Sequence, residues 1–87
     1  MYTVDFTENA RKQLIELNKR APKAMGKLIQ LLSELEEHPR SGTGQAERLK
    51  HFSVETWSRR ITREHRLVYE IHEDRILVIV LSVFGHY

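Results

Sequence analysis

The sequence contains no cysteine, only two prolines and four glycines, and no long run of apolar residues. Without cysteine there is no disulfide framework, no thiolate zinc site and no thiol nucleophile. The longest apolar run, residues 76–81, is far shorter than the roughly 20 residues of a membrane-spanning helix. The first residues show no basic stretch followed by an apolar one, so no signal peptide is expected. We therefore expect a small cytoplasmic protein that does not enter the membrane.

The composition indicates one small domain with a basic middle section. Of the 87 residues, 40% are apolar and 30% are charged, which suits a compact soluble domain and is too apolar for a disordered chain. The formal net charge is +2, yet residues 40–66 hold seven basic and three acidic residues, a local net charge of +4. Such a surplus favours phosphate-rich partners. A solvated basic face is the other interpretation that it allows.

Apolar residues recur first with the period of a strand and then with the period of helices. Alternation over residues 2–6 predicts a strand, and Thr7 is suited to cap the helix that follows it. Pro22 suits the first turn of a second helix, which we expect to end before Pro39. The apolar residues of this second helix are expected to face the core; they are Met25, Leu28, Ile29, Leu32 and Leu35.

After a glycine-containing loop at residues 39–46, the period changes to that of strands. Residues 57–61, 66–71 and 76–84 are predicted strands, with a turn at residues 72–75. A short strand near residues 47–52 would be an addition to them. The predicted fold class is α+β, with residues 1–87 forming a single domain in the order β-α-α-β-β-β. The two helices would pack on one face of a small, mostly antiparallel sheet.

Several familiar chemistries lack the residues that they require. Residues 41–44, Ser-Gly-Thr-Gly, have no following lysine of the kind that a phosphate-binding loop uses. The five histidines are scattered, without the spacing of a metal site. No nucleophile-elbow sequence surrounds any serine. We therefore expect neither a cofactor nor a bound metal ion.

RNA can be cleaved without a metal or a cofactor, because its own 2′-OH can attack the adjacent phosphate. That reaction needs a general base, a general acid and cations that stabilise the charge on phosphorus. The chain offers Glu47 after the loop, Arg60 and Arg66 on neighbouring predicted strands, and the terminal pair His86-Tyr87. Other roles stay open from the residues alone, because Glu47 and Arg66 are also suited to surface ion pairs with nearby charged residues.

Two segments and the last two residues resemble one family of bacterial toxins. Residues 42–51, Gly-Thr-Gly-Gln-Ala-Glu-Arg-Leu-Lys-His, are similar to the glycine-rich loop and Glu-x-Leu-Lys-His segment of the YoeB family. Residues 57–69, Trp-Ser-Arg-Arg-Ile-Thr-Arg-Glu-His-Arg-Leu-Val-Tyr, resemble its Trp-Ser-Arg-Arg-Ile…His-Arg-Leu-Val-Tyr signature. The chain also ends in His-Tyr, as these toxins typically do. A local departure is Val83-Phe84-Gly85, where some members carry an arginine or a tyrosine.

The resemblance implies a fold of the RelE-type superfamily and a role as a ribosome-dependent mRNA endonuclease of a type II toxin–antitoxin system. By position it implies catalytic roles for Glu47, Arg66 and His86. Lys50 and Arg60 match basic positions near the RNA phosphates. His51 is a further candidate for contact with the substrate, and Tyr87 is a candidate for base stacking.

The implied partners are a cognate YefM-type antitoxin, the ribosome with its rRNA, and mRNA. Operator DNA would be bound only through the antitoxin complex, and a second copy of the chain would form a homodimer. Two rival functions use the same basic residues. One is a non-catalytic module that binds RNA or forms a DNA-binding co-repressor with the antitoxin. The other is a related toxin that acts on a different target, such as DNA gyrase.

Overall fold

The computed structural model describes residues 1–85, so His86 and Tyr87 lie outside the described residues. The described chain runs β1 (Thr3–Phe6), α1 (Glu8–Arg20), α2 (Ala24–Glu37), β2 (Glu47–Leu49), β3 (Thr56–Arg60), β4 (Arg66–His72), the short 3₁₀ helix η1 (Glu73–Arg75) and β5 (Leu77–Gly85). The strands form one sheet in the spatial order β1-β5-β4-β3-β2. Among the strands of residues 1–85, only β1 and β5 pair in parallel.

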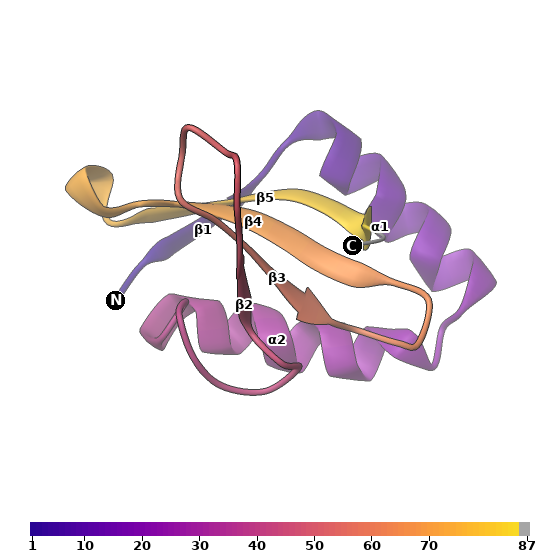
Figure 1. The fold of residues 1–87 in the computed structure, drawn as a ribbon. Coiled ribbons are helices and arrows are strands. Elements are labelled where there is room, and N and C mark those ends of the chain that lie inside the picture. The colour runs from indigo at the N-terminus through magenta and orange to yellow at the C-terminus, as the bar shows by residue number, and fades with distance from the viewer. Residues whose placement is uncertain (86–87) are drawn as a thin grey trace.

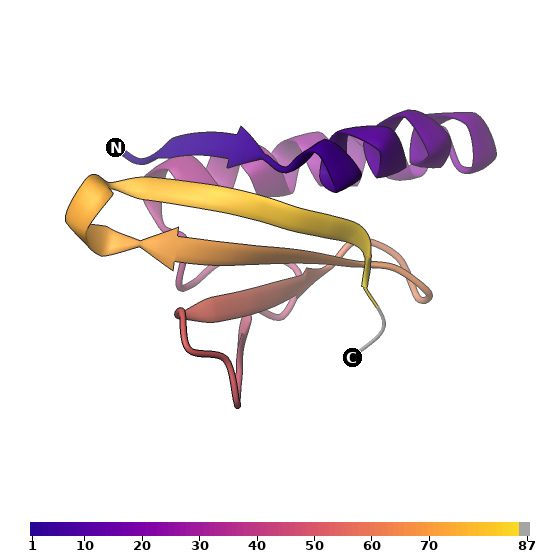
Figure 2. The same ribbon diagram turned by 90° about the horizontal axis from the view of Figure 1, so that it is seen from above.

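The predicted fold class is confirmed: two helices lie on the same side of a mostly antiparallel sheet (Figures 1 and 2). The chain order contains one strand more than the six-element prediction. The additional strand is β2, the short strand near residues 47–52 that the sequence left open. No helix within residues 1–85 is long and apolar enough to cross a membrane.

The ends of the helices follow from local chemistry. The Thr7 hydroxyl accepts a hydrogen bond from the Ala10 amide at 3.0 Å, which confirms the predicted cap of α1. The second helix begins later than predicted, because Pro22 belongs to a turn in which its carbonyl accepts the Met25 amide at 3.2 Å. It ends at Glu37, just before the residue that precedes Pro39.

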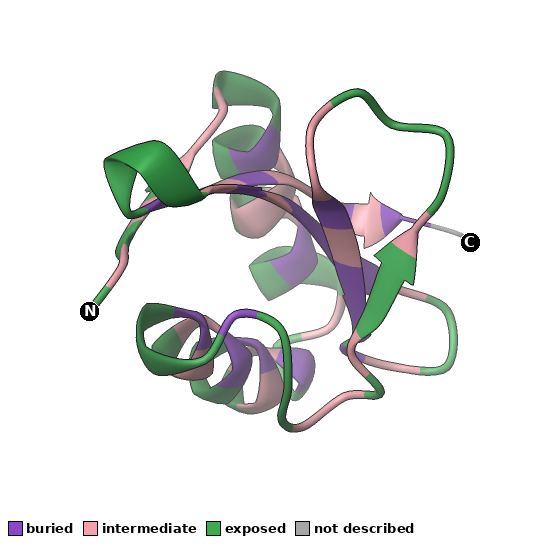
Figure 3. Cartoon of the chain, turned by 60° about the vertical axis from the view of Figure 1, so that its left-hand side comes forward, coloured by how far each residue is buried: buried purple, intermediate pink, exposed green. Residues whose placement is uncertain are grey.

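The core lies between the helices and the sheet, and much of the connecting loops is exposed (Figure 3). On α1, Ala10 and Leu17 are fully buried. On α2 the prediction was wrong at one position, because Ile29 is 61% exposed and Leu31 is buried instead. Leu28, Leu31 and Leu35 follow the i, i+3, i+7 spacing of one helix face, and that face is directed at the sheet.

We expect Leu17→Ala to lower the free energy of unfolding by about 2–5 kcal/mol, because the removed side chain leaves a cavity in a closely packed core. Ile15 is on the same helix and is 61% exposed, so Ile15→Ala should change stability by less than about 0.5 kcal/mol. Urea denaturation of both variants measures the difference. Equal losses would contradict the assignment of the buried face.

Candidate functional site

Alternation along β3 sends its two adjacent arginines to opposite faces of the sheet. Arg59 lies on the helix side and is fully buried, and it contacts Glu34 of α2. Arg60 lies on the other side, which we call the open face, and is exposed. Ser58 shares the open face with Arg60, since successive strand residues point to opposite sides.

Arg66, the first residue of β4, is held on the open face by two hydrogen bonds. Its Nε donates to the Ser58 hydroxyl at 3.0 Å, and its Nη2 donates to the Gln45 carbonyl at 3.3 Å. The residue as a whole is 9% exposed. Two of its five N–H donors are thereby used, and the others have no partner among residues 1–85. The guanidinium is thus fixed in orientation with donors still available.

Arg60 and Arg66 stand directly opposite each other in the β3–β4 ladder. Like charges in this position are destabilising, and within residues 1–85 neither arginine forms an ion pair with an acid. Arg20, Arg40 and Arg59 each pair with a glutamate. The predicted alternative of a salt bridge from Arg66 to Glu64 or Glu70 is therefore not found among the described residues. This part of the open face is therefore suited to an anion.

Glu47 lies next to this pair, at the start of the edge strand β2. It is exposed, and the register places it opposite Ser58, the residue that accepts a hydrogen bond from Arg66. Its side chain is therefore on the open face as well. Residues 1–85 contain no ion pair of Glu47 with Arg48 or Lys50, the other role that the sequence allowed. Glu47 and Arg66 thus flank the same serine.

The end of β5 lies next to Arg66. Gly85 is opposite Arg66 in the β4–β5 ladder, after irregular register between Arg66 and Tyr69. The carboxamide oxygen of Gln13 on α1 accepts the amides of Val83 and Phe84 at 2.8 and 3.3 Å. The predicted residues His86 and Tyr87 directly follow Gly85 but lie outside the described residues.

Lys50 and His51 lie in the connection between β2 and β3, where both are exposed. His51 has a positive φ of 70°, which is uncommon outside glycine. No polar contact within residues 1–85 joins either side chain to Glu47 or Arg66. The structure therefore gathers Glu47, Arg60 and Arg66, and it leaves Lys50 and His51 on an adjacent exposed segment.

Ser58, Gln45 and Arg59 are site residues that the sequence did not single out. Gln45 acts through its backbone carbonyl, for which no sequence signal exists. Arg59 had a signal, because it shares the strand phase of Trp57, a large apolar residue that packs against the core. A charged residue in that phase indicates a buried polar network.

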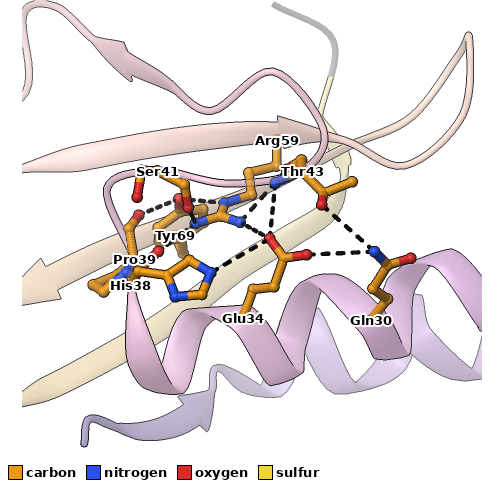
Figure 4. A network of polar contacts seen from close by, with 8 residues as sticks. All are labelled: Gln30, Glu34, His38, Pro39, Ser41, Thr43, Arg59 and Tyr69. Carbon is orange, nitrogen blue, oxygen red and sulfur yellow. Dashed lines mark hydrogen bonds and ion pairs between the residues drawn. The ribbon is translucent and has the colours of Figure 1, made fainter.

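Arg59 is the centre of such a network, which holds the loop before β2 (Figure 4). Its Nη2 donates to the carbonyls of His38 and Ser41 at 2.7 and 2.6 Å, and its Nη1 donates to the Glu34 carboxylate at 2.8 Å. Its Nε donates to the Tyr69 hydroxyl at 3.0 Å, and that hydroxyl donates to the Pro39 carbonyl at 2.6 Å. The loop therefore turns its carbonyls inward, towards one cation.

The backbone of this loop requires glycine. Gly44 has a φ of 85°, and a Cβ there would lie 2.9 Å from the Arg60 carbonyl oxygen. That close approach allows the Arg60 amide to donate to the Gly44 carbonyl at 2.6 Å. The loop is thereby joined to β3 one residue before Gln45, whose carbonyl holds Arg66. Backbone geometry thus connects the buried network to the open face.

Two observations define the chemistry of the open face. Its arginine pair is suited to phosphate, since a guanidinium can bind two phosphate oxygens at once. Its exposed carboxylate is suited to accept a proton. Within residues 1–85 no three histidine, aspartate or glutamate side chains are grouped so that they could hold a metal ion.

Comparison with known proteins shows the family to which the chain belongs. Residues 6–87 match the family model described as the YoeB-like toxin of bacterial type II toxin–antitoxin systems. The chain is 43% identical to Toxin YoeB of Escherichia coli K12 over 63 residues, which cover 72% of this chain and 71% of that protein. It is 36% identical to Toxin YoeB of Synechocystis over 84 residues, covering 97% and 95%. The chain therefore belongs to the YoeB family of type II toxins.

Solved structures of this class share the fold over the whole chain. The YoeB dimer of Staphylococcus aureus superposes with a TM-score of 0.85 at 28% identity, covering 99% of this chain and 98% of that one. The heterotetrameric YoeB–YefM complex of the same organism gives a TM-score of 0.81 at 27% identity, with coverage of 100% and 99%. The isolated RelE toxin of E. coli gives 0.74 at 28% identity, with coverage of 100% and 86%. The protein is thus a toxin of the YoeB and RelE type.

We expect Glu34→Gln to weaken the acid dependence of stability. Hydrogen bonding from Thr43, with a contribution from the positive charge of Arg59, holds the pKa of Glu34 below its ordinary value, although burial opposes this. A lowered pKa in the folded state stabilises the protein above the ordinary pKa, and this is lost as pH falls through the lowered value. The stability difference between the two proteins should therefore shrink from pH 7 towards pH 3, as measured by urea denaturation. A constant difference would contradict this assignment.

Proposed function

We propose that this toxin is a metal-independent endoribonuclease that cleaves translated mRNA in the ribosomal A site. The observation that carries the proposal is the cross-strand pair Arg60–Arg66, which has no acidic partner among residues 1–85 and lies beside Glu47. A phosphate of the RNA backbone would compensate both charges. The carboxylate would then stand next to the ribose that the phosphate joins.

Glu47 is the general base in this proposal. It removes the proton of the 2′-OH, whose oxygen attacks the adjacent phosphorus. The leaving 5′-oxygen departs with a proton from the general acid, so the first product carries a 2′,3′-cyclic phosphate. The exposed position of Glu47 at the start of an edge strand gives a ribose access to its carboxylate.

Arg66 stabilises the additional negative charge that develops on the phosphate oxygens in the transition state. Its hydrogen bonds to Ser58 and Gln45 orient the guanidinium before the substrate arrives, so little reorganisation accompanies the reaction. Arg60 is exposed and contributes to substrate binding, together with Lys50 and His51 on the adjacent connection.

His86 is the proposed general acid, and Tyr87 offers a ring on which a base can stack. Both residues lie outside the described residues. Support for their roles comes from the end of β5, because Gly85, opposite Arg66, directly precedes His86. An imidazole has an ordinary pKa near 6.5 and can donate a proton at neutral pH when negative charge is nearby.

The expected partners follow from the family. The solved YoeB–YefM complex and the YoeB dimer of S. aureus support a YefM-type antitoxin and a second copy of this chain as partners. Operator DNA would be bound through the antitoxin complex. Because its target is the translating ribosome, the toxin would act in the cytoplasm, with rRNA and mRNA as its ligands.

Glu47→Ala, Arg66→Ala and His86→Ala should each lower the rate of mRNA cleavage on ribosomes by about 10²–10⁴-fold, because each removes a group that acts on the reacting atoms. Primer extension on ribosome-bound mRNA measures the rate, and circular dichroism confirms that each variant is folded. Arg48→Ala is the matched control, since this exposed residue follows Glu47 in the opposite phase of β2.

Unchanged cleavage in all three variants would refute the proposal. A non-catalytic RNA-binding module would behave differently again. Its affinity for RNA would survive Glu47→Ala and would fall steeply with salt concentration.

We expect free mRNA to be cleaved far more slowly than the same mRNA on ribosomes. A small basic surface cannot by itself hold the 2′-oxygen, the phosphorus and the leaving oxygen in line, whereas the ribosome fixes both mRNA and toxin. Cleavage of one transcript with and without ribosomes tests this. Equal rates would show that the toxin alone positions its substrate.

A further inference from the structure

The loop of residues 38–46 has one internal support that the proposed reaction does not use directly. The guanidinium of Arg59 is fully buried and reaches the carbonyls of His38 and Ser41, the Glu34 carboxylate and the Tyr69 hydroxyl. We propose that Arg59 is a positioning residue, which fixes this loop and thereby the geometry of Glu47 and Arg66. This inference rests on the proposed function of that site.

The loop depends on side-chain contacts rather than on regular secondary structure. It contains the positive-φ residues Gly42, Gly44 and Gln45 and forms no regular structure before β2. Its inward carbonyls need donors, because a buried carbonyl without a partner costs free energy. Arg59 provides them from inside the fold, as Figure 4 shows. Removing the fork of donors would therefore release the loop.

The loop ends next to the candidate site that contains Glu47 and Arg66. The Gly44 carbonyl accepts the Arg60 amide at 2.6 Å, and the Gln45 carbonyl accepts a hydrogen bond from Arg66 at 3.3 Å. Two residues later the chain enters β2 at Glu47, and β2 has only three residues. A shift of the loop consequently moves one of the two anchors of Arg66 and the start of the strand that carries the carboxylate.

The contacts of Arg59 depend on the planar shape of its guanidinium. Lysine keeps the positive charge but presents a point-like ammonium with three donors, whereas arginine presents a planar fork of five. The acceptors around Arg59 come from α2, the loop and β4, in different directions. Arg59→Lys therefore preserves the charge and loses the geometry. This makes it the informative substitution.

Arg40 provides a matched control in the same loop. It also binds its surroundings through a guanidinium, but at the surface, where it pairs with Glu55 and Glu73 at 2.8 and 2.9 Å. Arg40→Gln removes two ion pairs from the loop without touching its inward carbonyls. An effect that is specific to Arg59 should be absent from this variant.

The structural test is amide hydrogen exchange. In Arg59→Lys we expect exchange at the amides of Thr43 and Arg60 to be at least about 10-fold faster, because their acceptors are Glu34 and the Gly44 carbonyl. Amides of the β4–β5 ladder should keep their protection. If Arg59→Lys does not fold, Tyr69→Phe provides the same test in milder form, since it removes one acceptor of Arg59 and one donor to the loop. Uniformly faster exchange, or unchanged loop amides, would overturn the proposal.

The kinetic test separates positioning from binding. On ribosome-bound mRNA, Arg59→Lys should lower kcat by about 10²-fold and leave KM nearly unchanged, because small misplacements of reacting groups have effects of this size. Arg40→Gln should retain kcat. In a Glu47→Ala Arg66→Ala background, Arg59→Lys should add little further loss, since it acts through the groups already removed. A raised KM with unchanged kcat, or fully additive losses, would contradict the proposal.

The two proposals can fail separately. If Glu47→Ala, Arg66→Ala and His86→Ala all cleave mRNA normally, the proposed function fails, whatever the behaviour of Arg59. If those variants are inactive and Arg59→Lys is fully active despite a released loop, only the positioning role of Arg59 is refuted.

Discussion

The buried guanidinium of Arg59 is the interaction on which the rest of the site depends. A cation that is buried away from water is tolerated only when each of its N–H donors has a hydrogen-bond acceptor and a nearby negative charge compensates its own. Here the charge is compensated by Glu34 of α2, and the acceptors come from the loop and from Tyr69 of β4. Satisfying one side chain therefore brings together three parts of the chain. The strand β2, which carries the candidate base, begins where this loop ends.

Neighbouring arginines in β3 illustrate how a strand gives similar residues different roles. Arg59 points to the helices and has a compensated charge, so its guanidinium can be buried. Arg60 points to the open face, where it is opposite Arg66 and has no acidic partner within residues 1–85. Repulsion between these two positive charges lowers the stability of the folded protein, and a bound phosphate would relieve it. The arginine pair therefore favours binding of an anionic ligand and at the same time disfavours the folded state of the free toxin.

Much of the fold was predictable because burial imposes a period on the sequence. Alternation and helical spacing located both helices and the longer strands, and Thr7 marked the start of α1. The strand β2 was less clear, since three residues at a sheet edge are too few to show a period. Ile29 was wrongly expected in the core. Ile29 and Leu31 both fit an apolar stripe on α2, and only the position of the sheet beside the helix decides which of them is buried.

For the site, the sequence by itself determined which chemical groups were present: a carboxylate, several guanidinium groups, and no thiol. Only the tertiary structure decided which of them meet. Strand register put Glu47, Ser58 and Arg66 side by side, and a backbone carbonyl of Gln45 completed the contacts of Arg66. Register and backbone contacts depend on the packing of segments far apart in the chain, and no local pattern of residues specifies them.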